Sequence, residues 1–145
     1  MKKLWTMVLM LVGISGYAQP ENLPVEVGSA FLAKYNKAKT IDWWVENQQY
    51  YIDFVLGGGS YFAVFDQQGG WIETAETISE MEIPAELRGY IRSHFSSGSI
   101  CICEKVENAQ MQKFLRVSLI DADNVEHVLR SDLDGNNIVL QETLP

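Results

Sequence analysis

The sequence predicts an α+β fold, arranged as a tandem repeat of two units in which one helix packs on an antiparallel meander sheet of about four strands. The first observation behind this prediction is an internal repeat. Residues 66–78 align without gaps on residues 132–144, with Asp, Gly, Ile, Glu and Thr at identical offsets, and residues 23–27 align on residues 83–87. Self-similarity of this kind is typical of tandem architectures.

Each unit is expected to open with a helix. Pro24 and Pro84 suit the first helical position, where a missing N–H group costs nothing. After each proline, apolar residues recur at i, i+3, i+4 and i+8 and so form one apolar helix face. These residues are Val27, Ala30, Phe31 and Tyr35 in the first unit and Leu87, Tyr90, Ile91 and Phe95 in the second.

The remainder of each unit is predicted to form antiparallel strands, because aromatic and β-branched runs alternate with turns rich in Gly, Asn and Asp. The predicted strands of the first unit are residues 40–46, 50–56, 61–65 and 71–74, and those of the second are residues 100–107, 113–120, 125–130 and 137–141. Short links favour a meander, and one helix can cover only one face of such a sheet.

The amino-terminal residues have the pattern of a bacterial secretory signal peptide. Lys2 and Lys3 precede an apolar run from Leu4 to Gly13. Small residues then occupy the −3 and −1 positions of a cleavage site before Gln19. The run is too short, and wrongly flanked, for a stable membrane span. We therefore expect the protein to be exported to the periplasm or the medium.

Three segments follow from these observations. Residues 1–18 are assigned to the signal peptide, residues 19–80 to the first unit and residues 81–145 to the second unit. Units of this size are marginally stable alone, so we expect them to pack together as one compact domain.

The chain is acidic. It contains 11 Lys and Arg residues against 19 Asp and Glu residues, which gives a net charge of −8, and removal of the two lysines of the signal peptide would make it −10. This balance argues against nucleic acid and anionic membranes as partners, because both attract basic patches. Solvated acidic residues also serve solubility, so the charge alone identifies no partner.

The sequence contains no recognisable catalytic or metal-binding set. Asp66 and Asp132 stand in turns next to Gly, where an Asp side chain bonds its own backbone. His94 and His127 lack the further ligands at known spacing that a zinc site requires. We therefore expect no enzymatic activity, no cofactor and no metal.

Aromatic residues on the predicted strands form a candidate binding surface. Strand alternation directs Trp43 and Phe54 to the helix-covered face and Trp44, Tyr51 and Trp71 to the opposite, uncovered face. Exposed aromatic clusters mark binding surfaces. The same rings could instead pack against the second unit or stabilise cross-strand pairs. Trp44, Tyr51 and Trp71 are the predicted partner-binding residues.

The order of elements resembles the PepSY-like family, a group of small exported proteins described as β-lactamase-inhibitor-like. A helix, a Trp-bearing strand and an aromatic strand lead to Phe65-Asp66-x-x-Gly69 and then to Trp71-Ile72-Glu73-Thr74. The resemblance extends from about Leu23 to the C-terminus and implies binding rather than catalysis. The second unit departs from the pattern, with Ser131 and Asn137 aligned on Phe65 and Trp71, so the two units are not expected to bind alike.

The sequence therefore predicts an exported, non-catalytic, inhibitor-like binding module that presents an open sheet face to a protein of the cell envelope. The alternative is a small-ligand or lipid-binding envelope protein with a cavity between the two units. Neither hypothesis involves nucleic acid or stable membrane insertion.

Overall fold

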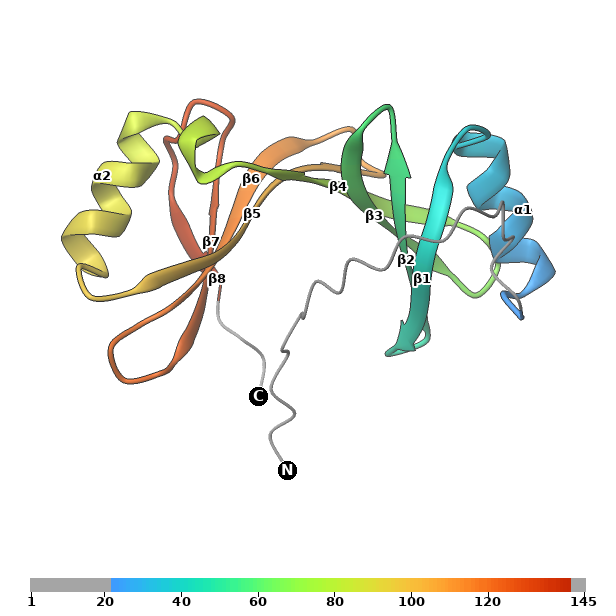
Figure 1. Cartoon of the computed structure of the whole chain (residues 1–145), viewed down its shortest axis with the longest axis horizontal. Helices are drawn as coiled ribbons and strands as arrows, with labels where there is room; N and C mark the ends of the chain where they lie inside the picture. Colours follow the sequence, from blue (N-terminus) through green and yellow to red (C-terminus); the bar gives the residue numbers. More distant parts are fainter. Residues whose placement is uncertain (1–21, 142–145) are drawn as a thin grey trace.

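Eight antiparallel strands and two α-helices make up the computed structural model, which describes residues 22–141 (Figure 1). The strands form one continuous sheet in chain order, from β1 to β8, with each strand hydrogen-bonded to the next. The elements are α1 (Val25–Lys34), β1 (Lys39–Glu46), β2 (Gln49–Leu56), β3 (Gly59–Asp66), β4 (Trp71–Ile78), the 3-10 helix η1 (Glu80–Glu82), α2 (Ala85–His94), β5 (Ser99–Asn108), β6 (Lys113–Ile120), β7 (Glu126–Ser131) and β8 (Val139–Gln141). The predicted signal peptide, residues 1–18, lies outside the described residues.

The predicted tandem of two separate helix-plus-meander units is wrong, because a single eight-stranded sheet runs through the whole described chain. β4 does not end at residue 74 but continues to Ile78. Its later part pairs with β5, from Glu73 opposite Asn108 to Ile78 opposite Cys103. Two separate sheets would have left the backbone groups of both strands unpaired at exposed edges, and pairing satisfies them.

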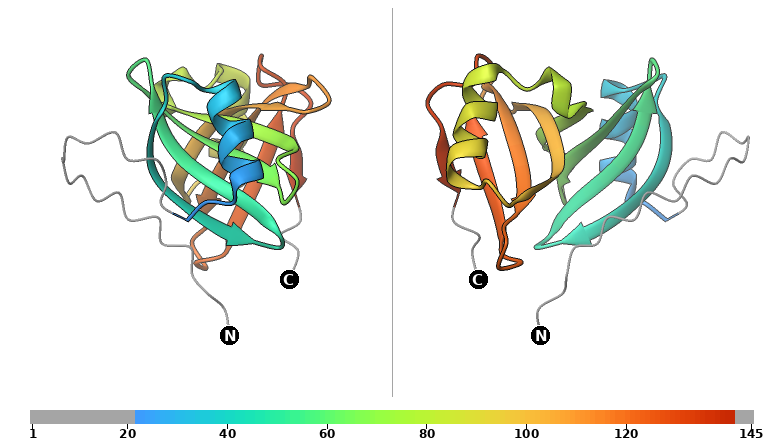
Figure 2. Two further views of the ribbon diagram at one scale, coloured as in Figure 1. Left: turned by 90° about the vertical axis from the view of Figure 1, so that its right-hand side faces the viewer. Right: turned by 60° about the vertical axis from the view of Figure 1, so that its left-hand side comes forward.

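Both helices lie on one face of this sheet, which we call the helix face; the opposite face is the open face. On β4 the hydroxyl of Thr74 hydrogen-bonds to that of Tyr35, which follows α1, while Ile78 packs in the cluster beneath α2. Residues 74 and 78 of one strand point to the same side, so α1 and α2 share that side. Figures 1 and 2 show the two helices at opposite ends of the molecule, on the outer sides of the curved sheet.

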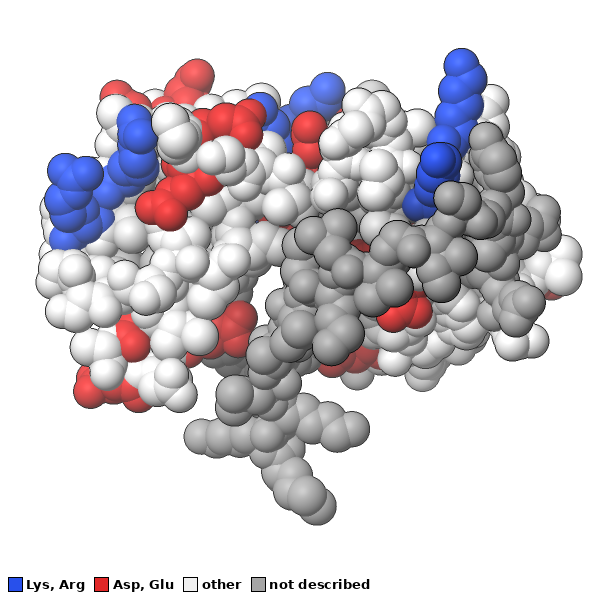
Figure 3. Space-filling model, in the orientation of Figure 1, with Lys and Arg blue, Asp and Glu red and all other residues white. Residues whose placement is uncertain are grey.

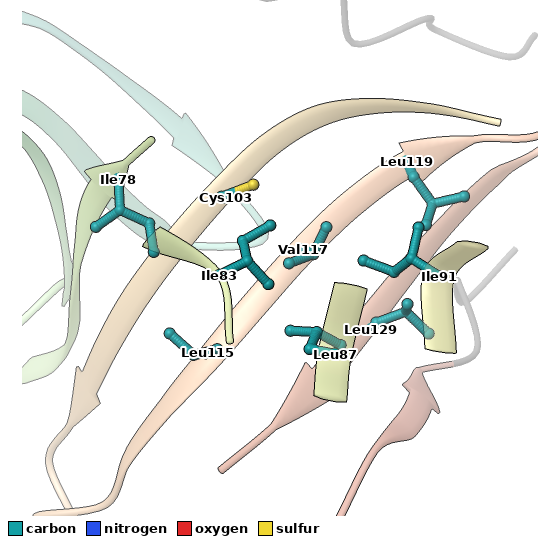
Figure 4. Close-up of a cluster of buried hydrophobic side chains, with 9 residues drawn as sticks. All are labelled: Ile78, Ile83, Leu87, Ile91, Cys103, Leu115, Val117, Leu119 and Leu129. Atoms are coloured by element: carbon teal, nitrogen blue, oxygen red, sulfur yellow. The ribbon is translucent and has the colours of Figure 1, made fainter. Parts of the chain in front are cut away.

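Two hydrophobic clusters hold the helices on the sheet. Beneath α1, Phe31 meets Phe54 edge to face, with ring centroids 5.1 Å apart and an interplanar angle of 78°. Beneath α2, the buried side chains come from β4 to β7, from the helix itself and from the short link between η1 and α2 (Figure 4). They are Ile78, Ile83, Leu87, Ile91, Cys103, Leu115, Val117, Leu119 and Leu129. The predicted apolar helix faces are confirmed, since Val27, Phe31, Leu87 and Ile91 are buried.

The repeated Asp-x-x-Gly motif forms a tight turn in both places. Asp66 Oδ1 accepts hydrogen bonds from the N–H groups of Gln68, at 2.9 Å, and Gly70, at 2.7 Å. Asp132 Oδ1 accepts the equivalent pair in the turn before β8. The predicted structural role of both aspartates is confirmed, because each carboxylate satisfies backbone donors of its own turn.

The glycine of each motif lets the turn pack against a helix. Gly69 has φ +81°, and a Cβ there would lie 2.6 Å from the carbonyl oxygen of Glu26 in α1. Gly135 has φ +82°, and a Cβ there would lie 2.8 Å from Pro84 at the start of α2. Glycine is therefore required by both the backbone conformation and the close approach.

Candidate binding site on the open sheet face

Two of the three predicted binding residues meet on the open face. Trp44 on β1 lies directly opposite Tyr51 on β2. Their rings stack in parallel, with centroids 5.2 Å apart and an interplanar angle of 11°. Regular alternation places the neighbouring Trp43 on the helix face, where it packs against the cluster beneath α1. The stacked, half-buried pair offers a rigid flat surface on which a partner side chain can lie.

Trp71 does not join this pair. A bulge between β3 and β4 pairs Phe65 with Trp71 but Val64 with Glu73, which leaves Ile72 as the extra residue. Trp71 therefore shares the helix face with Phe65, and Lys34 Nζ of α1 lies 3.7 Å from the centroid of its ring. The predicted open-face position of Trp71 is wrong because simple alternation cannot anticipate a bulge.

The open face continues across the sheet as two adjacent rows of side chains. The first row consists of Trp44, Tyr51, Val64, Glu73 and Asn108. The second row consists of Asp42, Asp53, Phe62, Ala75, Val106 and Phe114. Phe62, Ala75, Val106 and Phe114 form a small apolar cluster of their own. The open face therefore combines aromatic, apolar and acidic groups in a fixed register.

A triad of charged residues, which sequence reasoning missed, lies on the same face. Arg116 on β6 donates from Nε to Glu104 Oε2 at 2.7 Å and from Nη1 to Glu73 Oε1 at 2.8 Å. Glu104 is only 4% exposed, and this burial raises the pKa of its carboxyl group in spite of the neighbouring guanidinium. The Arg116 guanidinium also lies 5.5 Å from the ring centroid of Phe62. One cation thus serves two carboxylates, and the triad keeps a net negative charge.

Asp53 stands beside this triad in a different environment. It lies opposite Asp42 on β1 and opposite Phe62 on β3. Burial raises the pKa of Asp53 to about 6, and the carboxylates of Asp42 and Glu104 add to the effect. Among residues 22–141, the ion pairs that hold Glu73 and Glu104 do not extend to Asp53. The open face therefore contains a half-buried carboxylate whose charge is compensated by no ion pair in the described part of the chain.

Asp53→Asn should stabilise the protein at neutral pH. The carboxyl pKa is about 6 in the folded protein against 3.8 for the isolated side chain, so the folded state holds the proton more tightly. Stability contributed by the protonated form is therefore lost as pH rises from about 4 to about 6. The full shift corresponds to about 3 kcal/mol, and solvent screening of a half-buried group reduces the expected gain to about 1–2 kcal/mol.

Urea unfolding at pH 7.5 and pH 4 would measure this effect. The gain should be present at the higher pH and almost absent at the lower, where Asp53 is protonated in the folded protein. Asp123→Asn, in the exposed turn between β6 and β7, removes the same charge and should show no such difference. If Asp53→Asn and Asp123→Asn change the free energy of unfolding equally at both pH values, the environment assigned to Asp53 is wrong.

No family model and no curated protein matches this chain. Solved structures, however, are similar to it in fold. A DUF2874 family protein from Bacteroides uniformis has a TM-score of 0.68 at 20% identity, over 82% of this chain and 88% of that one. A candidate periplasmic protein from Bacteroides eggerthii has a TM-score of 0.67 at 20% identity, over 81% and 87% of the two chains.

A BLIP-like protein from Bacteroides fragilis has a TM-score of 0.64 at 16% identity and covers 88% of this chain and 89% of its own. At such identities the similarity shows the fold alone. The chain thus has a BLIP-like fold, which supports the inhibitor-like part of the sequence resemblance at the level of architecture. Membership of the PepSY-like family is not shown, since no family model matches.

Two further observations apply to residues 22–141. Neither helix there has the length and apolar character needed to cross a membrane. The same residues bring together no group of three or more His, Cys, Asp or Glu side chains that could hold a metal ion.

Proposed function

We propose that this protein is an exported, non-catalytic binding module that holds a protein partner against the open face of its sheet. The observation that carries the proposal is the stacked Trp44–Tyr51 pair beside ordered charged groups, on a sheet face that neither helix covers. Rigid aromatic surfaces bordered by polar groups are the usual anchors of protein interfaces. The BLIP-like and periplasmic descriptions of the similar structures support the same reading.

The sheet is suited to hold such a surface in place. Tyr51 packs between Trp44 on one side and Phe62 on the other, with centroids 5.2 Å and 6.4 Å away. Arg116 joins β4, β5 and β6 across the same face through its two carboxylate partners. Little side-chain entropy would be lost on binding, because these side chains are already fixed by their neighbours.

Trp44→Ala should weaken partner binding by about 2 kcal/mol or more, roughly 30-fold in affinity, because it removes a hot-spot aromatic. It should lower the free energy of unfolding by only about 1 kcal/mol, since the ring is half-buried on the open face, where it stacks on Tyr51. Immobilised wild-type and variant proteins, exposed to envelope extract of the native host, would show whether one stoichiometric protein is captured by the wild type alone. Affinity for that protein would then be measured by calorimetry.

The matched control is Met81→Ala, which truncates a side chain 84% exposed on η1, away from the open face. This variant should capture the partner as the wild type does. Undiminished binding by Trp44→Ala, at preserved stability, would rule out the open face as the binding surface.

A depression on the helix face supports the second candidate function, the binding of a small ligand or lipid. It has a volume of about 330 Å³ and is lined by groups that include Tyr35, Tyr61, Lys105 and Leu133. Ligand pockets begin at about this size. Native mass spectrometry of protein from the host envelope would test it: a bound small molecule that is lost in Leu133→Trp, which fills the depression, would favour this function.

A further inference from the structure

We propose that the partner contacts the open face through a basic side chain, Arg or Lys, which binds beside Asp53 against the Trp44–Tyr51 stack. This inference rests on the proposed function and specifies the chemistry of its partner. Three observations carry it: the charges around the stack, the aromatic groups beside Asp53, and the consequence of covering Asp53 with any other kind of group.

The charges around the stack are predominantly acidic. Asp42 lies opposite Asp53 in the second row, and the carboxylates of Glu46 and Glu73 raise the pKa of Tyr51 beyond the effect of its burial. Two basic residues of the first six strands share this face: the Arg116 guanidinium is already held between two carboxylates, and Lys39 lies opposite Val55, two residues along β2 from Asp53. On the face of the molecule seen in Figure 3, the coloured side chains in the lower part are acidic.

The aromatic groups suit a cation as well. A guanidinium or ammonium group is attracted to the face of an aromatic ring, and the attraction grows as water is excluded. The chain uses this arrangement itself on the open face, where the Arg130 guanidinium lies 3.7 Å from the ring centroid of Phe114. A basic side chain next to Asp53 would combine such a contact with a charge-assisted hydrogen bond.

Other partner groups fit less well. An acidic group would face Asp42, Asp53 and Glu104 at once. An apolar group would remove the remaining water from Asp53 and leave a buried carboxylate without a counter-ion, which is strongly unfavourable. A second copy of this chain, with its own net charge of −8, would add like charge to an acidic face.

The presence of a carboxylate at position 53 is also consistent with a role in binding. Its burial and the carboxylate of Asp42 directly opposite disfavour its ionisation, although Asn would have nearly the same shape. Residues that reduce stability in a folded scaffold are concentrated where function requires them. A partner cation would stabilise the ionised carboxylate of Asp53. The electrostatic environment of Asp53 therefore favours the binding of a cation.

The test uses the full mature protein and three capped hexapeptides, of Arg, Gln and Glu, as probes at low ionic strength. Two-dimensional NMR would follow the amide signals of Asp42 and Asp53 and the indole signal of Trp44. We expect saturable shifts of these signals with the Arg peptide and none with the Glu peptide. Asp53→Asn should weaken the Arg peptide about fivefold or more, and Asp123→Asn, with the same charge change, less than about twofold.

Two results would overturn the inference. One is that the Arg peptide shifts no NMR signals, or only signals of other residues. The other is that Asp53→Asn and Asp123→Asn weaken binding of the Arg peptide equally. Failure of the proposed function has a different signature. If Trp44→Ala abolishes capture of the envelope partner while Asp53→Asn leaves it intact, the open face binds a partner but not through a cation at Asp53. If Trp44→Ala leaves capture unchanged, the proposed function itself fails. Asp53→Asn remains folded by our stability prediction, so lost binding would not reflect unfolding.

Discussion

Arg116→Met should lower the free energy of unfolding by about 3–5 kcal/mol, because it removes the cation of a buried ion pair and leaves its partners in place. Glu104 is 4% exposed, and its carboxylate would lose the 2.7 Å hydrogen bond from Arg116 Nε. Glu73 would lose its 2.8 Å bond at the same time. Two carboxylates would then face each other across a sheet face with limited access to water.

The pH dependence of this variant gives a second readout. Arg116 lowers the pKa of Glu104 against the effect of burial, so its loss must raise that pKa further. A raised carboxyl pKa means that ionisation opposes folding, and the variant should therefore regain stability as the pH falls toward 5. Urea unfolding at pH 7.5 and pH 5 would show this change.

Two controls make the result specific to the triad. Arg88→Met, on the exposed surface of α2, removes the same charge and should change stability by less than about 0.5 kcal/mol. Combining Arg116→Met with Glu104→Gln should recover part of the loss, since the orphaned charge is then removed as well. A loss no larger than that of Arg88→Met would show that the triad does not contribute as described.

Local patterns in the sequence predicted the helices and most of the strands, because these depend on nearby residues. The spacing of Val27 and Phe31, and of Leu87 and Ile91, is enough to define the buried helix faces. The single sheet was not predicted, because Ala75 and Glu76 belong to residue types that are depleted in strands and so appeared to end the strand at Thr74. The short segment of residues 75–78 provides most of the pairing with β5 and so decides whether one sheet or two are formed.

The candidate site was predictable only where strand pairing is regular. Trp44 and Tyr51 belong to a regular part of the β1–β2 pair, so alternation placed both on the open face correctly. Trp71 is separated from the regular β3–β4 pairs by the bulge at Ile72, so it lies on the face opposite to the one that alternation from Glu73 predicted. The triad could not be predicted without the pairing of β4, β5 and β6. Glu73, Glu104 and Arg116 are distant in sequence and come together only because these three strands are neighbours in the sheet.

Phe54→Ala should lower the free energy of unfolding by about 3–5 kcal/mol, through lost burial and the cavity left behind. Phe54 is fully buried on the helix face and lies within ring contact of Phe31, Tyr35 and Tyr61, at centroid distances of 5.1, 4.8 and 5.5 Å. Truncation would therefore remove the centre of an aromatic cluster that joins α1 to β2 and β3.

Thermal and urea unfolding of Phe54→Ala and Trp44→Ala, measured side by side, would check the assignment of the two faces. Phe54→Ala should be the more destabilising by about 2 kcal/mol or more, because Phe54 is fully buried whereas Trp44 is half-buried on the open face. If Trp44→Ala proves the more destabilising, the register between β1 and β2 is wrong by one residue. Every side chain of these strands would then lie on the opposite face, and the binding surface built on Trp44, Tyr51 and Asp53 would fall with it.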